Sequence, residues 1–160
     1  MTESGKPLKP DLQRRSRHGA APALTALARA LLLATLVIVV AVLAMPGAGV
    51  SALADQWPEL AASIRRLKWI WPGIDIFHAL LFAVTGLLAA LAYPSAGTGR
   101  LLLVLFVLAA FTEYLQVWIP GRSSSLLELA VDLAGAVAGV TIGRLATHVL
   151  ARSARKFEAA

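Results

Sequence analysis

The sequence predicts an all-α integral membrane protein, a bundle of four transmembrane helices with an amphipathic interfacial helix between the first and second spans. Of the 160 residues, 58% are apolar and 15% are charged, and the mean hydropathy is +0.73. A soluble domain of this size could not hide that much hydrocarbon from water. The apolar residues also fall into long blocks bounded by Arg, Pro, Gly and Trp, as membrane spans do.

Four spans are expected within one transmembrane domain at 24–149, at about residues 24–45, 74–93, 101–119 and 126–149. Each block is long enough to cross the bilayer and is followed by a proline, a glycine or basic residues. Residues 1–23 are expected to form a disordered cytoplasmic tail, and residues 150–160 a second cytoplasmic tail. A rival interpretation makes the first block a signal peptide, because Ala52-Leu53-Ala54 has the small-residue pattern of a cleavage site.

The segment from Asp55 to Trp71 has the pattern of an amphipathic helix, with apolar residues three and four positions apart. One face carries Trp57, Leu60, Ile64, Leu67 and Trp71, and the other carries Gln56, Glu59, Arg65, Arg66 and Lys68. The pattern fits a helix that lies in the headgroup plane with tryptophan anchors, and it fits a packed connector equally well.

The net charge of +6 is explained by basic residues that flank the spans, so we interpret it as a topology signal and expect no nucleic-acid partner. Lysine and arginine are most frequent in the two tails, which places both termini in the cytoplasm and the protein in the inner or plasma membrane. Residues 55–73 and the turn at 120–125 would then lie outside. The absence of cysteine excludes disulfides, a thiol nucleophile and Cys-based metal sites.

Ionisable side chains are expected to gather near the outer ends of three spans. At a rise of about 1.5 Å per residue, their side chains fall within roughly 10 Å of the outer boundary. Buried carboxylates are costly, so at least one should be protonated, paired with an arginine or a histidine, or bound to a cation. The arginine that follows the Pro120-Gly121 turn is the expected partner of the acids. The candidate ligand site or polar network comprises His78, Glu113, Gln116, Arg122, Glu128 and Asp132.

The fourth span carries a glycine stripe, formed by Gly135, Gly139 and Gly143, which continues the face of Glu128 and Asp132. Glycines four apart let a neighbouring helix approach closely, so this face is expected to pack inside the bundle. The two acids would then point inward.

Four short segments carry a resemblance to a known family. They are Asp75-Ile76-Phe77-His78, Glu113-Tyr114-Leu115-Gln116, Pro120-Gly121-Arg122-Ser123-Ser124-Ser125 and Glu128-Leu129-Ala130-Val131-Asp132, the last followed by Gly135. In this order they resemble the VanZ-like membrane proteins over about residues 73–143. The chain departs from the family pattern at Asp75, where lysine is common, at Glu128, where aspartate is favoured, and at Asp132, where asparagine is favoured.

The resemblance implies a cell-envelope membrane protein whose namesake is an accessory factor in resistance to the glycopeptide teicoplanin. Our leading hypothesis is a non-enzymatic protein whose outer-leaflet polar pocket binds a membrane lipid, an amphiphile or its headgroup and affects glycopeptide susceptibility. His78 and Arg122 would be the hydrogen-bond donors. The sequence does not indicate an oligomeric state.

Three alternatives remain. One is a membrane-embedded enzyme that acts on a lipid or envelope precursor; the chain shows no nucleophile motif, and Ser123 to Ser125 fit turn and helix-cap positions better. Another is a proton or cation pathway, and the third is a buried charge network that only clamps the helices together. We expect no cofactor and no metal, because the spacing of His78, Glu113, Glu128 and Asp132 matches no compact metal motif.

Overall fold

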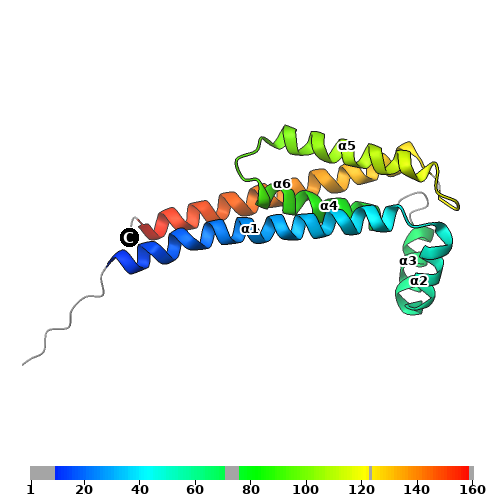
Figure 1. Cartoon of the computed structure of the whole chain (residues 1–160), viewed down its shortest axis with the longest axis horizontal. Helices are drawn as coiled ribbons and strands as arrows, with labels where there is room; N and C mark the ends of the chain where they lie inside the picture. The colour runs from blue at the N-terminus through cyan, green and yellow to red at the C-terminus, as the bar shows by residue number, and fades with distance from the viewer. Residues whose placement is uncertain (1–9, 71–75, 123, 159–160) are drawn as a thin grey trace, which may run out of the picture.

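The computed structural model describes residues 10–70, 76–122 and 124–158, and every regular element in these residues is a helix (Figure 1). In order they are α1 (Pro10–Leu43), α2 (Gly47–Asp55), α3 (Pro58–Ile70), α4 (Ile76–Ala92), α5 (Thr98–Gln116) and α6 (Leu126–Glu158). Three segments are long and apolar enough to cross a membrane, namely Ala23–Leu43 in α1, α5, and Leu126–Leu150 in α6. Helix α4 is also apolar but has only 17 residues.

The first and last helices extend beyond their predicted spans. Helix α1 begins at Pro10, so residues 10–23 are helical where the sequence predicts a disordered tail, and residues 1–9 lie outside the described part. Helix α6 likewise continues to Glu158. The physical reason is cooperativity, because extending an existing helix adds a hydrogen bond per residue without a new nucleation step.

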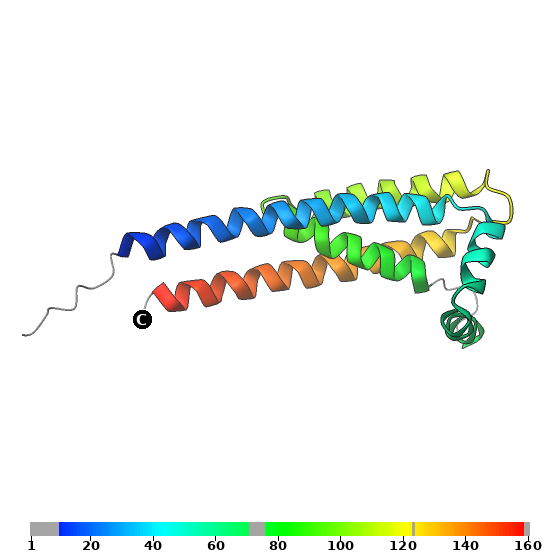
Figure 2. The same cartoon turned by 60° about the horizontal axis from the view of Figure 1, so that its bottom comes forward.

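Helices α1, α4, α5 and α6 lie side by side, with α4 and α6 in closest contact (Figures 1 and 2). A Cβ atom added at Gly139 would lie 1.9 Å from the carbonyl oxygen of Ala83, and one at Gly135 would lie 2.2 Å from that of Ala79. The glycine stripe of α6 therefore faces α4 backbone to backbone. On the α4 side, Gly86 makes the reciprocal approach to α6.

The buried core lies between these four helices and includes Val39, Phe82, Leu105, Ala136 and Val140. The opposite faces expose large apolar side chains, among them Leu33, Val37, Val104, Val107 and Ile142. An apolar surface of this extent on parallel helices is what contact with lipid hydrocarbon requires.

Helices α2 and α3 project across one end of the molecule, which we call the α2–α3 end (Figure 2). The structure thus has two helices where the sequence predicts one, because α2 precedes the amphipathic segment, and Gln56 and Trp57 separate it from α3. Trp57 and Trp69 are exposed. The tripeptide considered as a cleavage site, Ala52–Ala54, lies within α2, and Trp71 lies outside the described residues.

At the α2–α3 end, the turn between α1 and α2 contacts the turn between α5 and α6. The backbone N–H of Gly47 donates to the carbonyl oxygen of Pro120 at 3.2 Å. A Cβ atom at Gly47 would lie 2.6 Å from the oxygen of Gly121, which itself has φ of +75°. Glycine is required at both positions, at one by the close approach and at the other by the left-handed backbone.

Where α4 ends, partway along α1 and α6, arginines from these two helices donate to the carbonyl oxygens of its last residue and of the turn that follows (Figure 1). Arg29 donates through Nε to the carbonyl oxygen of Ala92 at 3.3 Å, and its guanidinium carbon lies 5.3 Å from the centre of the Tyr93 ring. Arg144 donates to the carbonyl oxygens of Pro94, at 2.7 Å, and of Ala96. Carbonyls at a helix terminus have no intrahelical donor, so these arginines supply one.

Candidate functional site

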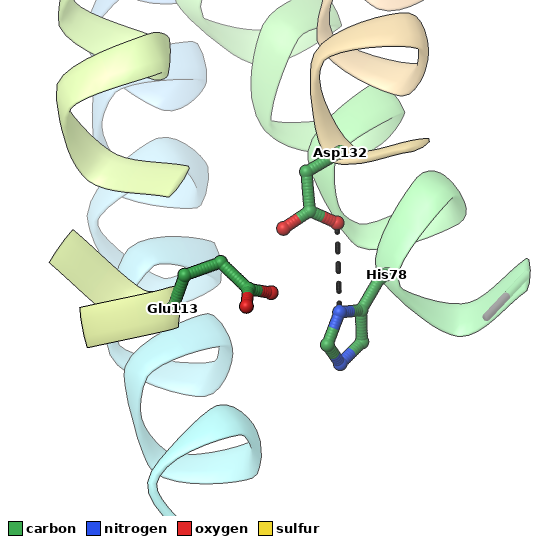
Figure 3. Close-up of side chains that lie close together, drawn as sticks. All are labelled: His78, Glu113 and Asp132. Atoms are coloured by element: carbon green, nitrogen blue, oxygen red, sulfur yellow. Dashed lines mark ion pairs between the residues drawn. The ribbon is translucent and has the colours of Figure 1, made fainter. Parts of the chain in front are cut away.

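Three ionisable side chains from three helices meet at the α2–α3 end (Figure 3). His78 is the third residue of α4, Glu113 is the fourth from the end of α5, and Asp132 is the seventh of α6. One ligand atom from each lies within 4.8 Å of the other two. All three side chains are buried, and Asp132 is completely shielded from solvent. We call these three residues the polar centre.

His78 and Asp132 face each other across the tight contact of α4 and α6. The imidazole Nδ1 lies 3.6 Å from the carboxylate Oδ1, which is within ion-pair distance but longer than a hydrogen bond (Figure 3). Ala79, the next residue after His78, contacts Gly135 on the following turn of α6. The glycine therefore sets how closely the two ionisable side chains approach.

Glu113 is held by the amino end of α6. Its Oε2 accepts a hydrogen bond from the backbone N–H of Ser125 at 3.0 Å. Ser125 is the N-cap residue of α6, and its Oγ accepts from the backbone N–H of Glu128 at 3.1 Å, so the expected capping role of this serine is observed. The partial positive charge of a helix amino terminus favours a carboxylate at this position.

The other predicted acid, Glu128, takes a different position. It lies one turn before Asp132 on α6 and is half-buried. The group of close ligand atoms contains Asp132 and not Glu128. Because helix α6 begins at Leu126, Glu128 sits in its first turn, where an acidic residue complements the helix dipole.

Arg122 and Gln116 hold the end of α1. The guanidinium of Arg122 donates from Nε to the carbonyl oxygen of Met45 at 3.2 Å and from a terminal nitrogen to that of Val42 at 2.8 Å. The buried amide of Gln116 donates to the carbonyl oxygen of Leu43 at 3.3 Å. The prediction placed Arg122 over the carboxylates, but its described hydrogen bonds go to main-chain carbonyls. The physical reason is that the last carbonyls of a helix in an apolar environment need donors.

Two features of the centre did not follow from the sequence. One is which of the acids pairs with His78, because the choice of Asp132 depends on the relative rotation of α4 and α6. The other is the main-chain donor that Ser125 offers to Glu113. A signal for the second was present, because Ser125 and Glu128 stand in the Ser-x-x-Glu spacing of a capping box, and that spacing predicts a helix start at Leu126.

An imidazole and two carboxylates can perform several kinds of chemistry. They can accept hydrogen bonds from a ligand, exchange protons, or bind a metal ion through one nitrogen and two oxygens. Burial strengthens each of these interactions, because the low local dielectric screens charge poorly. The polar centre is therefore the candidate functional site among the described residues.

The family assignment agrees with this arrangement. A family model described as VanZ/LLP1 matches residues 25–147, a segment that contains the polar centre, the glycine stripe and the arginine that caps α1. No curated protein and no solved structure matches the chain. Since the matched segment covers most of the 160 residues, the chain belongs to the VanZ/LLP1 family, as its sequence motifs predict.

Proposed function

We propose that this protein is a non-enzymatic, multi-pass component of the inner or plasma membrane whose polar centre binds the headgroup of an envelope amphiphile at the outer leaflet. The observation that carries the proposal is the convergence of His78, Glu113 and Asp132, which three helices bring together while all three are buried. Ionisable residues inside a membrane protein are costly and mark functional sites more often than not.

The proposed topology has both termini in the cytoplasm and the α2–α3 end outside. Supporting it, Arg29, Arg144 and Arg152 lie away from the α2–α3 end, on the side of the molecule toward the two termini, and basic residues concentrate on the cytoplasmic side of membrane proteins. Helix α4 completes a four-helix bundle in this proposal. Its 17 residues span about 25 Å, which is slightly less than the hydrocarbon core of about 30 Å. The arginine caps on its carboxyl end satisfy carbonyls that would otherwise lie in lipid.

The proposed role of α3 is that of an interfacial helix beside the binding site. Trp69 is 86% exposed at one end of the helix, and Trp57 is exposed just before the other. Arg65 and Arg66 are also exposed, and with Ala62 and Trp69 they line a shallow hollow. Tryptophan and arginine together fit the headgroup layer, where an aromatic ring meets a charged surface.

The hydrogen-bonding roles in the site differ from those expected from the sequence. Arg122 donates its hydrogen bonds to carbonyl oxygens at the end of α1. We therefore assign it the role of holding α1 in position beside the site. His78 remains as the candidate donor to a headgroup, and the carboxylates of Glu113 and Asp132 are its acceptors. Family membership supports an effect on susceptibility to glycopeptides of the teicoplanin type, in line with the family's namesake.

The test is lipid analysis of the full-length protein extracted in mild detergent, by native mass spectrometry, together with teicoplanin susceptibility of the producing cells. We expect wild type to retain one class of amphiphile above the bulk lipid background. His78→Gln and Glu113→Gln should lose that class and the change in susceptibility, because each removes a polar group while keeping the side-chain size.

The matched control is Glu59→Gln, which neutralises an exposed carboxylate on α3 and should behave as wild type. Quantification of each variant in the membrane separates a lost site from a lost protein. If all four proteins accumulate to the same level and retain identical lipids, headgroup binding at the polar centre is refuted.

A further inference from the structure

We propose that the polar centre is a binding site for a divalent transition-metal ion, with Zn²⁺ as the best match, and with His78, Glu113 and Asp132 as the protein ligands. This rests on the proposed function in one respect, because the ion would lie where the headgroup binds and would supply its anchor. The sequence argued against a metal because no compact ligand motif is present. In the structure the three ligands come from three different helices, so no compact sequence motif is needed to bring them together.

The distances require little adjustment. Zinc binds nitrogen and oxygen ligands at about 2.0–2.2 Å, so two ligands of one tetrahedral ion lie roughly 3.3–3.6 Å apart. Nδ1 of His78 and Oδ1 of Asp132 are separated by 3.6 Å, which already fits. All three ligand atoms lie within 4.8 Å of one another, and the Glu113 side chain faces the other two (Figure 3). Small side-chain rotations would bring its carboxylate to the same ion.

The charge balance favours a dication. Two carboxylates lie buried among apolar helices at the α2–α3 end, and a single imidazole can offset at most one of them. A buried like-charged pair is costly unless a proton or a cation compensates it. A divalent ion bound to both carboxylates and to the neutral imidazole gives a complex with no net charge.

The donor set indicates which ions fit. One imidazole nitrogen with two carboxylate oxygens suits Zn²⁺ or Mn²⁺, whereas Ca²⁺ and Mg²⁺ prefer oxygen ligands alone. The chain has no cysteine, so an ion that needs thiolate ligands is disfavoured. The hydrogen bond from the Ser125 N–H to Oε2 of Glu113 acts as outer-shell support, as is usual for carboxylates that bind metals.

Three protein ligands leave a coordination position open on a tetrahedral ion, as in sites that bind an exchangeable ligand. This assigns a ligand class to the proposed function. Without an ion, the two carboxylates would repel an anionic headgroup. With a dication bound, the same centre would accept an anionic oxygen, such as that of a phosphate-bearing amphiphile.

The experiment uses the full-length protein in detergent, stripped with EDTA, dialysed and titrated with Zn²⁺ alone. Bound metal is measured by elemental mass spectrometry, and Co²⁺ is substituted to give a visible absorption spectrum that reports nitrogen and oxygen ligands. We expect about one ion per chain and a tetrahedral Co²⁺ spectrum. Asp132→Asn should weaken Zn²⁺ binding by more than the roughly 10- to 100-fold typical of losing an outer-shell partner.

Glu128→Gln is the matched control, because this carboxylate lies one turn away on the same helix but outside the group of close ligand atoms. It should bind Zn²⁺ as wild type does. Wild-type protein that remains folded but takes up less than a tenth of an equivalent of Zn²⁺, or that binds no better than Asp132→Asn, would overturn the metal site.

The two proposals fail in different ways. Retention of the amphiphile after EDTA treatment, with no Zn²⁺ uptake, would remove the ion and leave headgroup binding in place. Stoichiometric Zn²⁺ binding with no retained amphiphile would leave the metal site in place and remove headgroup binding. Loss of the amphiphile on EDTA treatment and its return with Zn²⁺ would support both.

Discussion

The close contact between α4 and α6 makes a sharp prediction for Gly139→Ala. The added Cβ would lie 1.9 Å from the Ala83 carbonyl oxygen and 2.9 Å from the Leu87 nitrogen, and both are backbone atoms that no side-chain rotation can move. The helices must therefore separate by roughly 1 Å, and overpacking of this kind costs about 1–3 kcal/mol. Alanine recovers about 0.5–1 kcal/mol because it restricts the unfolded chain. We expect a net loss of about 1–2 kcal/mol, or roughly 5- to 30-fold in the unfolding equilibrium.

The assay is SDS-induced unfolding of the detergent-solubilised protein, followed by pulse proteolysis. The matched control is Gly99→Ala, because Gly99 lies in the first turn of α5 and an added Cβ would meet nothing within 4 Å. This control should be neutral or slightly stabilising. Gly143→Ala should be milder than Gly139→Ala, since its closest contacts are longer, at 2.7 Å to the Cβ atom of Ala90 and 3.0 Å to the carbonyl oxygen of Leu87. If the three variants unfold at the same SDS concentration, the backbone contact of α4 and α6 does not have the assigned energetic role.

Two further predictions concern the ends of the molecule. Arg122→Lys replaces a planar group that donates to two carbonyls at the end of α1, and it should lower stability by about 1–2 kcal/mol in the same assay. Arg100→Lys, at an exposed position, should change it by less than about 0.5 kcal/mol, and equal effects would contradict the capping role. For topology, the absence of native cysteine allows Ser63→Cys and Ser95→Cys to be labelled singly with an impermeant maleimide. In intact cells the first should react and the second should not, and the opposite pattern would reverse the proposed orientation.

The sequence predicted the membrane-spanning helices well because each span is a long apolar block, and such a block in lipid has few alternatives to a helix. The candidate spans in α1 and α6 begin and end within two residues of the predicted ones. The sequence did not predict α2 or the full length of the first and last helices. Residues 10–23 and 150–158 are polar, yet they continue helices that hydrophobic spans have already nucleated.

The sequence predicted the depth at which the site residues lie, but not which of their side chains contact one another. Counting residues from the ends of the spans placed His78, Glu113 and Asp132 at a similar depth, because the rise of a helix is fixed. Which groups touch depends on helix rotation and on competing partners. Arg122 illustrates the second point, since charge alone favours a carboxylate, whereas its guanidinium donates to the carbonyl oxygens of Val42 and Met45 at the end of α1.

Gly135 affects both the packing of α4 against α6 and the geometry of the polar centre. Its missing side chain lets α6 approach the backbone of Ala79, and that approach places the neighbouring His78 opposite Asp132. A larger residue would push the two helices apart at the turn where their ionisable groups must face each other. The small-residue stripe of this membrane protein therefore does more than join helices without a hydrophobic driving force. At its first glycine, the same close contact also fixes the distance between two of the three side chains from which the proposed site is built.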